Sequence, residues 1–417
     1  MKDKLSTQFC ELGFKNPVVA ASATPTRNFE MMKKCVEAGV GGLVGKSASF
    51  QRIEQIHPSP CFYVMYPDQA RIGKFYSLYS TAQLAELPPE DFAKEIEKVR
   101  PIAKENNCRI ISDLMTGSLE EWKKMTEIFA PVSDMLELNV ACPFGSELAG
   151  GEKKGSLASS DPELIGMIAK AVREVTDLPL MIKLSIEGGD LVPICKAIEK
   201  MRVKAVHLTH RFTGLEIDIN TGKPILSQTL SGYGGPWMGP LSRKWVAKIA
   251  STTDLDICGG GGIDGWRDAI AHIMAGASII QMAAAPILRG HQVFAETLEG
   301  IEKFLDTQGY KSINEIKGVA LKYLKTLEEV PRRDVFRPKA EVDFDKCNGC
   351  GDCERVCFYG AVEIEEKAAI IDKQKCVGCA LCAQMCHREA IQLTFDGKIV
   401  PVFWEGARGK VAEQKRK

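Results

Sequence analysis

Eight cysteines between Cys347 and Cys386 have the spacing of a metal-cluster binding sequence. They form two runs of the pattern C-x2-C-x2-C-x3-C, whose short spacers let one tight loop place three thiolates around one face of a cubic cluster. Zinc is the alternative, since eight thiolates could hold two ions. The duplicated pattern favours two [4Fe–4S] clusters, with the fourth cysteine of each run binding the other cluster. The expected ligand sets are Cys347, Cys350, Cys353 and Cys386 for one cluster and Cys376, Cys379, Cys382 and Cys357 for the other.

A ninth cysteine has a different setting. Cys142 lies in "ELNVACPFG", where the run of strand-forming residues 135–140 ends in a cysteine, a proline and a glycine. A thiol on a loop beside a reactive site can donate or accept a proton. Lone cysteines are more commonly small core residues, so the residue types alone leave the role of Cys142 open.

Polar residues end several other strand-like runs, where an apolar residue would suit a core. They are Lys46, Asn139, Lys183 and His210. Alternation along a strand places Glu137 and Asn139 on one face. Any one of these groups could instead form an ion pair inside the barrel, and Glu137 with a lysine is a good candidate for this purely structural role. Their convergence at one rim favours a functional site.

Eight β-rich runs, separated by amphipathic helices, could position these residues. The helices are expected at 28–38, 89–105, 119–129, 161–175 and 265–275. Eight β/α units predict an α/β fold, a (β/α)8 TIM barrel, whose functional groups gather at the carboxyl ends of the strands. An open doubly wound sheet is the alternative, but no G-x-G-x-x-G follows the first strand. The expected strands are residues 16–22, 41–47, 109–115, 135–140, 180–185, 204–210, 255–260 and 278–283.

Glycines mark a candidate phosphate site near the last two strands. The stretch "ICGGGGIDG", residues 257–265, ends one strand and opens a helix, and "QMAAAP" ends the next strand. Small residues let backbone N–H groups approach an anion at a helix amino terminus. Phosphate binding at the seventh and eighth strands is common in such barrels, and here it would suit FMN.

Composition limits the classes of partner and the cellular location that the protein can have. The 417 residues carry 54 Lys+Arg and 54 Asp+Glu, so no net charge favours nucleic acid or a membrane surface. The amino terminus has no apolar signal region and no apolar run is long enough to cross a membrane. We expect a soluble cytoplasmic protein with a catalytic barrel at 1–325, a linker at 326–340, a ferredoxin-like domain at 341–400 and a tail at 401–417.

The order of these motifs resembles the dihydroorotate dehydrogenase superfamily. The segments "SATPT", "GLVGKS", "ELNVACPFG", "DPELI", "MIKLS", "GGGGIDG" and "GASIIQM" precede the two-cluster region. Within the superfamily, the chain is similar to the pyrimidine-reducing half of dihydropyrimidine dehydrogenase, whose ferredoxin module occupies the same place. The resemblance covers essentially the whole chain.

The resemblance implies a role for each matching residue. FMN would be contacted by Ala21, Ser22, Lys46, Lys183, Gly239, Gly261, Gly262, Ala283 and Ala284. Asn139 would bind the substrate, and Cys142 would be the acid/base opposite the flavin. The reaction would be reduction, or formation, of a C=C bond conjugated to a carbonyl, with hydride from the flavin N5 and a proton from Cys142. The glycine-rich segment after Cys142 would close over the site.

The chain departs from the pyrimidine-reducing pattern in the substrate pocket. Ala141 replaces a serine, His210 and Arg211 replace an asparagine–threonine pair, and Ser77 replaces an asparagine. Amide side chains can read an imide edge, whereas arginine favours carboxylate or phosphate. We therefore expect a substrate other than uracil, one whose anionic group Arg211 engages. A pyrimidine or dihydroorotate enzyme with a rearranged pocket is the alternative.

Electron delivery has to come from outside the barrel. The sequence shows no second dinucleotide-binding domain, so a separate NAD(P)H-oxidising flavoprotein subunit or a ferredoxin is expected to feed electrons through the clusters to FMN. By resemblance the chain would form a homodimer, alone or within a hetero-oligomer. An electron-transfer subunit without its own catalysis is the competing class, and the pairing of Asn139 with Cys142 argues against it.

Overall fold

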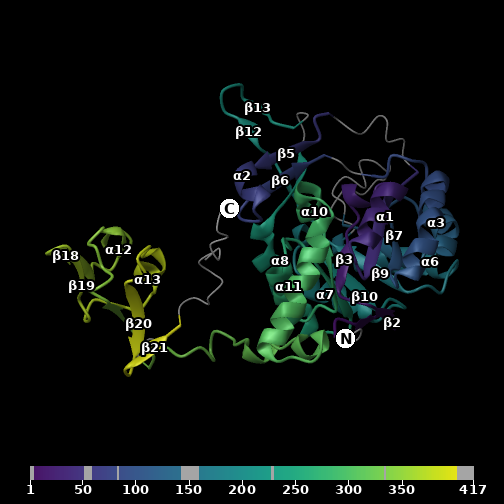
Figure 1. The fold of residues 1–417 in the computed structure, drawn as a ribbon. Helices are drawn as coiled ribbons and strands as arrows, with labels where there is room; N and C mark the ends of the chain where they lie inside the picture. The colour runs from purple at the N-terminus through teal and green to yellow at the C-terminus, as the bar shows by residue number, and fades with distance from the viewer. Residues whose placement is uncertain are drawn as a thin grey trace. The chain divides into compact units, whose positions relative to one another are not determined.

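The computed structural model describes residues 4–50, 59–81, 84–141, 159–226, 230–332 and 335–401. The chain divides into two compact units, Met1–Tyr323 and Leu324–Lys417. The first is a closed barrel of eight parallel strands surrounded by helices (Figure 1), so the predicted (β/α)8 fold is confirmed. No helix in the described part of the chain is long and apolar enough to cross a membrane.

All eight predicted strands form the barrel, and their neighbours follow chain order around the ring. They are β3 (Val18–Ala20), β4 (Gly42–Ala48), β7 (Arg109–Leu114), β8 (Met135–Asn139), β9 (Leu180–Leu184), β10 (Ala205–Leu208), β15 (Asp256–Gly260) and β16 (Ile279–Met282). β16 pairs with β3 and closes the ring.

Helices cover the outer face of the barrel, and the five predicted ones are present. Their ends follow from local capping: Asp161 accepts hydrogen bonds from two backbone N–H groups of α6, and Ser118 forms a capping box with Glu121 at α4. The helices are α1 (Phe29–Glu37), α3 (Pro89–Glu105), α4 (Leu119–Phe129), α6 (Pro162–Arg173), α7 (Leu191–Glu199), α8 (Gly239–Ala250), α9 (Trp266–Met274) and α11 (Gln292–Gln308), with the shorter α2 (Pro67–Arg71) and α10 (Ala284–Arg289).

Inward-facing residues recur at every second position of the barrel strands, and two successive levels of them lead up to the site. The lower layer is apolar and packs on Phe9 and Phe14 of the amino-terminal hairpin formed by β1 (Thr7–Phe9) and β2 (Leu12–Phe14). It consists of Val19, Val44, Ile111, Met135, Met181, Ala205, Cys258 and Ile279. Two residues further along each strand lies the upper layer, which we call the polar layer: Ala21, Lys46, Asp113, Glu137, Lys183, His207, Gly260 and Gln281.

A small antiparallel sheet completes this unit, and we call it the cover sheet. It contains β5 (Phe62–Met65), β6 (Ser77–Ser80), β14 (Ser231–Gly234) and β11 (Phe212–Gly214), with β6 and β14 in the centre. Figure 1 shows β5 and β6 at one end of the barrel, next to α2 and the hairpin β12 (Ile217–Asp218) and β13 (Lys223–Pro224). The expected strands did not include these segments.

The second unit contains two small sheets and two short helices. β17 (Lys339–Val342), β20 (Ile391–Phe395) and β21 (Lys398–Val400) form one sheet, and β18 (Val362–Glu365) pairs with β19 (Ala368–Ile371). The helices are α12 (Asp352–Arg355) and α13 (Leu381–Met385). β17 begins at Lys339, within the segment expected to be a linker, because Lys339 and Ala340 pair with Thr394 and Leu393.

Candidate active site

A cavity lies above the polar layer, at the carboxyl ends of the barrel strands. The cover sheet contributes Phe62, Leu78 and Ser80 to its wall, and the barrel contributes the cations Lys46 and Lys183. Of the residues predicted from the sequence, it is lined by Ala21, Ser22, Lys46, Asn139, Lys183, His210, Arg211, Gly261, Gly262, Ala283 and Ala284. The structure thus brings together residues from seven of the eight strand ends, as expected for the carboxyl end of such a barrel.

Three predicted residues are not part of this lining. Ser77 is buried, and its hydroxyl donates to the Tyr233 hydroxyl at 3.1 Å, while Ser80 reaches the cavity instead. Gly239 lies behind the wall at the start of α8, against Gly262. Cys142, and the glycine-rich segment that follows it, lie outside the described residues.

Gly262 makes a close approach that only glycine allows. Its φ is +75°, a left-handed conformation, and an added Cβ would stand 2.1 Å from the backbone nitrogen of Gly239. Gly261 has a φ of +84°. The two glycines therefore hold the end of β15 against the first turn of α8, and their backbone forms part of the cavity wall. A phosphate could approach such a surface closely.

The polar layer beneath the cavity is a buried network of charges. The Lys183 ammonium donates to Glu137 at 2.9 Å and to Asp113 at 3.0 Å, so the candidate ion pair between Glu137 and a lysine is present in the barrel interior. Glu137 also accepts from Gln281 at 2.6 Å and lies 2.9 Å from His207 Nδ1. Burial opposes the charge on Glu137, yet Lys183 and His207 hold its pKa well below the usual value.

Asn139 is oriented by the same network. Its amide nitrogen lies 3.2 and 3.3 Å from the two carboxylate oxygens of Asp113, and its amide oxygen accepts from the backbone nitrogen of Ala141 at 3.3 Å. The donor side of the amide therefore faces Asp113. Both the donor and the acceptor of this amide therefore already have a partner within the protein.

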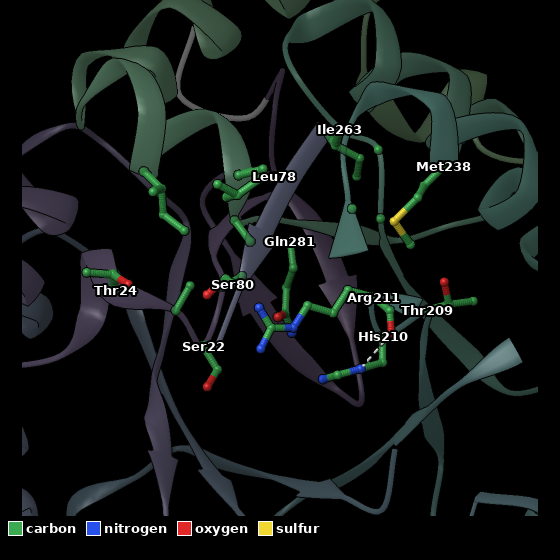
Figure 2. Close-up of a pocket in the computed structure, with 18 of the residues that line it drawn as sticks. Ser22, Thr24, Leu78, Ser80, Thr209, His210, Arg211, Met238, Ile263 and Gln281 are labelled. Atoms are coloured by element: carbon green, nitrogen blue, oxygen red, sulfur yellow. Dashed lines mark hydrogen bonds between the residues drawn. The ribbon is translucent and has the colours of Figure 1, made fainter. Parts of the chain in front are cut away.

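His210 and Arg211 enter the cavity from the loop after β10 (Figure 2). His210 Nδ1 lies 2.9 Å from the Arg211 carbonyl oxygen, and burial together with nearby Lys183 and Arg211 lowers its pKa well below the usual value. His210 is thus neutral at physiological pH. The Arg211 side chain lies on Gly232 of the cover sheet, where an added Cβ would stand 2.1 Å from Nε.

Three members of the network, Asp113, His207 and Gln281, were not predicted from the sequence. Each lies two residues beyond an apolar inward-facing residue in a predicted strand. Strand alternation was therefore the signal that could have identified them. Gly260 faces His207, and a Cβ there would stand 2.2 Å from His207 Nε2, so this glycine provides space for the imidazole.

In the second unit, the eight predicted cysteines are free thiols that gather around two small cavities. The first cavity is lined by Cys347, Cys350, Cys353 and Cys386, and the second by Cys357, Cys376, Cys379 and Cys382. This division is the one expected from the sequence. Four thiols around a small enclosed space are a donor set that suits an iron–sulfur cluster.

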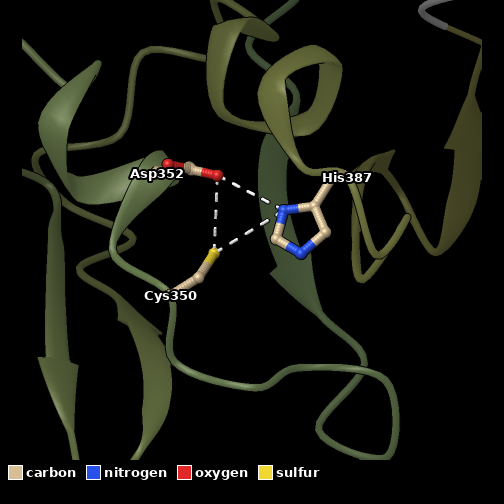
Figure 3. Close-up of side chains that lie close together, drawn as sticks. All are labelled: Cys350, Asp352 and His387. Atoms are coloured by element: carbon tan, nitrogen blue, oxygen red, sulfur yellow. Dashed lines mark hydrogen bonds and ion pairs between the residues drawn. The ribbon is translucent and has the colours of Figure 1, made fainter.

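His387 lies next to Cys350 and Asp352 (Figure 3), two residues that line the first of these cavities. Its Nδ1 is 3.3 Å from Asp352 and 3.9 Å from the sulfur of Cys350. The three side chains could together hold a metal ion, but Cys350 also belongs to the four-thiol set. His387 is therefore better placed as a hydrogen-bonding neighbour of a cluster ligand than as part of a separate metal site.

The barrel, its cation-lined cavity and the cysteine-rich unit together define an iron–sulfur flavoprotein oxidoreductase. Comparison with known families agrees: the profile for dihydroorotate dehydrogenase matches residues 4–305, and that for a 4Fe–4S dicluster domain matches residues 346–390. The chain thus belongs to the dihydroorotate dehydrogenase family, whose enzymes bind FMN.

Individual relatives fall into two groups. The catalytic subunit of dihydroorotate dehydrogenase B (NAD(+)) from Pyrococcus abyssi is 32% identical over 74% of this chain and 96% of its own length. Its counterpart from Thermococcus kodakarensis is 32% identical over 76% and 98%. The NAD-dependent dihydropyrimidine dehydrogenase subunit PreA from Escherichia coli is 27% identical over 87% of this chain and 88% of its own.

Proposed function

We propose that this protein is an FMN-dependent oxidoreductase that reduces, or forms, a C=C bond conjugated to a carbonyl, with electrons passing through two [4Fe–4S] clusters. The observation that carries the proposal is the combination, in one chain, of a cation-lined barrel cavity and two four-thiol cavities. Bound FMN would supply hydride transfer, which none of the protein's own side chains can provide.

The cavity offers a place for each part of FMN. Ala21 and Ser22 would lie along the ring, and Ser22 is held by a 3.0 Å hydrogen bond to Ser47. Lys46 and Lys183 would stabilise negative charge on the ring. The phosphate would lie against Gly261, Gly262, Ala283 and Ala284, with Gly239 holding this wall in place from behind.

Cys142 would transfer the proton on the substrate side. It follows Ala141, which is buried at the end of β8 and hydrogen-bonded to Asn139 at the cavity wall. The chain therefore leaves the barrel at the cavity just before Cys142. A thiol there would be within reach of a substrate bound beside Asn139, and general acid catalysis of this kind contributes about 10²–10⁴-fold.

The cavity favours an anionic substrate over uracil. Arg211 provides a guanidinium in the wall, His210 beside it is neutral, and the Asn139 amide directs its donor side to Asp113. An imide edge requires alternating donors and acceptors, whereas a carboxylate requires a cation. We place the anionic group of the substrate at Arg211, with His210 next to it. Ser77 would act through Tyr233, to which its hydroxyl donates.

The proposed electron donor is a separate protein, either a flavoprotein subunit that oxidises NAD(P)H or a ferredoxin. Relatives named as the catalytic subunit of an NAD(+) enzyme and as a subunit of an NAD-dependent enzyme support this arrangement. We propose a homodimer, alone or within a hetero-oligomer, located in the cytoplasm.

The test uses anaerobic holoprotein whose bound flavin has been photoreduced. Unsaturated acids, thioesters and enones are added in turn, and the return of flavin absorbance is followed. Reoxidation by an unsaturated acid, but not by its neutral ester, is the expected result. Fast reoxidation by uracil, which has no carboxylate, would instead overturn the anionic-substrate assignment. Orotate formation when dihydroorotate is added to the oxidised protein would establish the dihydroorotate activity named for the relatives, with its carboxylate as the anionic group.

A further inference from the structure

One lysine serves two buried carboxylates in the polar layer. Lys183 Nζ lies 3.0 Å from Asp113 Oδ2 and 2.9 Å from Glu137 Oε1, and both carboxylates are at most 1% exposed. A buried carboxylate requires compensation for its charge. A single ammonium shared by two such groups leaves one of them poorly compensated.

The hydrogen bonds show which carboxylate that is. The Glu137 carboxylate is contacted by the Lys183 ammonium, by His207 Nδ1 at 2.9 Å and by Gln281 Nε2 at 2.6 Å. Besides Lys183, Asp113 has the neutral amide of Asn139 at the longer distances of 3.2 and 3.3 Å. The negative charge is therefore better stabilised on Glu137 than on Asp113.

The elements around Asp113 bring few other charges to it. β8 contributes Glu137 and Asn139, and β9 contributes Lys183. β4 contributes a hydrogen bond from Ser47 and carries Lys46 in the same layer. Burial raises the pKa of Asp113 to about 7, with Glu137 adding to the rise and Lys183 opposing it.

We propose that Asp113 is a proton-accepting site that takes up a proton when the flavin in the cavity above Lys183 is reduced. This inference rests on the proposed function for the position of the flavin. A reduced flavin ring that is not protonated at its N1 edge carries an added negative charge. Placed beside Lys183, that charge competes with the carboxylates for the ammonium and repels them, which favours the protonated form of Asp113.

The balance of the step is simple. Two electrons arrive from the reduced iron–sulfur clusters and enter the flavin. One proton from solvent binds a carboxylate oxygen of Asp113, in addition to the proton that the flavin itself takes. No covalent bond between heavy atoms forms or breaks, and the proton returns to solvent when the flavin is reoxidised.

The test measures proton uptake by anaerobic holoprotein in a weakly buffered solution with a pH indicator, while the flavin is photoreduced. At about pH 8 the wild type is expected to take up close to one proton per flavin more than Asp113→Asn, because the carboxylate starts ionised. At about pH 6 Asp113 already holds its proton, so the difference should vanish. Equal uptake by the two proteins at both pH values would overturn the proposal.

Two further variants keep the result interpretable. In Glu137→Gln, Asp113 is the one carboxylate that remains beside the Lys183 ammonium, so it should stay ionised when the flavin is reduced. The extra proton uptake should therefore disappear although Asp113 is intact. Ser112→Ala changes the residue before Asp113 in β7, whose hydroxyl is hydrogen-bonded to that of Ser133 on the opposite face of the strand. This variant should behave as wild type. Loss of the extra proton in Ser112→Ala would contradict the assignment.

Flavin absorbance is read in the same sample. A failure to bind flavin, which would count against the proposed function, is thereby distinguished from a lack of proton uptake.

Discussion

Arg211 shows how a single side chain can depend on a residue far away in the sequence. Its guanidinium lies where a Cβ of residue 232 would be, so the position of the charge requires glycine at that place in β14. His210 beside it is held neutral by burial and by the neighbouring cations. The cavity therefore presents Arg211 as a permanent cation, whose location requires that residue 232 has no side chain.

Two variants test the role of Arg211, one by removing its side chain and one by displacing it. Orotate and uracil are a matched pair of probes that differ by one carboxylate, and their binding can be followed by perturbation of the flavin spectrum. Arg211→Ala should weaken orotate about 10–100-fold and leave uracil unchanged, because a charge-assisted hydrogen bond is worth about 1.5–3 kcal/mol. Gly232→Ala should do the same with Arg211 intact, since the new methyl displaces the guanidinium. An unchanged orotate-to-uracil ratio in both variants would exclude Arg211 as the anion site.

Cys142 is tested by separating electron transfer from substrate turnover. Cys142→Ser should lower the rate of flavin reoxidation by substrate about 10²–10⁴-fold, because a hydroxyl is a far weaker acid than a thiol. Reduction of the clusters and the flavin by the electron donor should be unchanged. A protein that serves only as an electron-transfer subunit would instead lose nothing in either step.

At the scale of elements, strand periodicity predicted more than composition did. The eight barrel strands were recognisable because each is a short run of β-branched and apolar residues between helices. The polar layer follows the same alternation, but of its charged and polar side chains only Lys46, Glu137 and Lys183 were predicted from the sequence. Asp113, His207 and Gln281 follow this alternation too, so it could place them on the inner face. Their partners come from other strands, so no local pattern could show which side chains meet.

The cover sheet could not be predicted from local pattern at all. Its central strands, β6 and β14, are four residues each, and neither is stable without the other. Their pairing is long-range, since it joins the segment after β4 to the segment after β10. The residues that line the cavity from this side therefore became visible only in the structure.

The glycines after β15 are expected to control flavin retention. Gly262→Ala introduces a left-handed non-glycine residue, which costs about 1–2 kcal/mol, and drives a methyl into the backbone of Gly239. FMN content after purification should fall markedly. The matched control is Gly265→Ala, where the backbone is extended and an added Cβ meets nothing within 4 Å, and its flavin-to-protein ratio should equal that of wild type.

At the scale of the whole molecule, the two units separate two kinds of chemistry. The barrel holds the cations and the cavity, and the second unit holds the eight thiols. Each has its own core, since the buried residues form separate clusters. Loss of a cluster should therefore leave the barrel folded and able to bind flavin.

This independence can be measured by iron and flavin analysis. Cys382→Ser should reduce iron from about eight to about four atoms per chain, as expected for loss of one cubic cluster. FMN content should be unchanged, while flavin reduction by the electron donor should slow sharply. Cys61→Ser, which changes a free thiol in the barrel unit, is the control and should keep its full iron. Loss of flavin together with iron in Cys382→Ser would show that the two units do not fold independently.

The cover sheet also has a consequence for the order in which the protein assembles. Ser77 and Tyr233, which meet across it, are 156 residues apart in the chain, and four of the eight barrel strands, β7 to β10, lie between them. Closing a loop of that length is entropically unfavourable until the intervening strands have found their places. The barrel should therefore close first, and the cover sheet should form last. Cofactor capture would then mark the end of folding, and a chain trapped before that stage would have native-like secondary structure but no flavin.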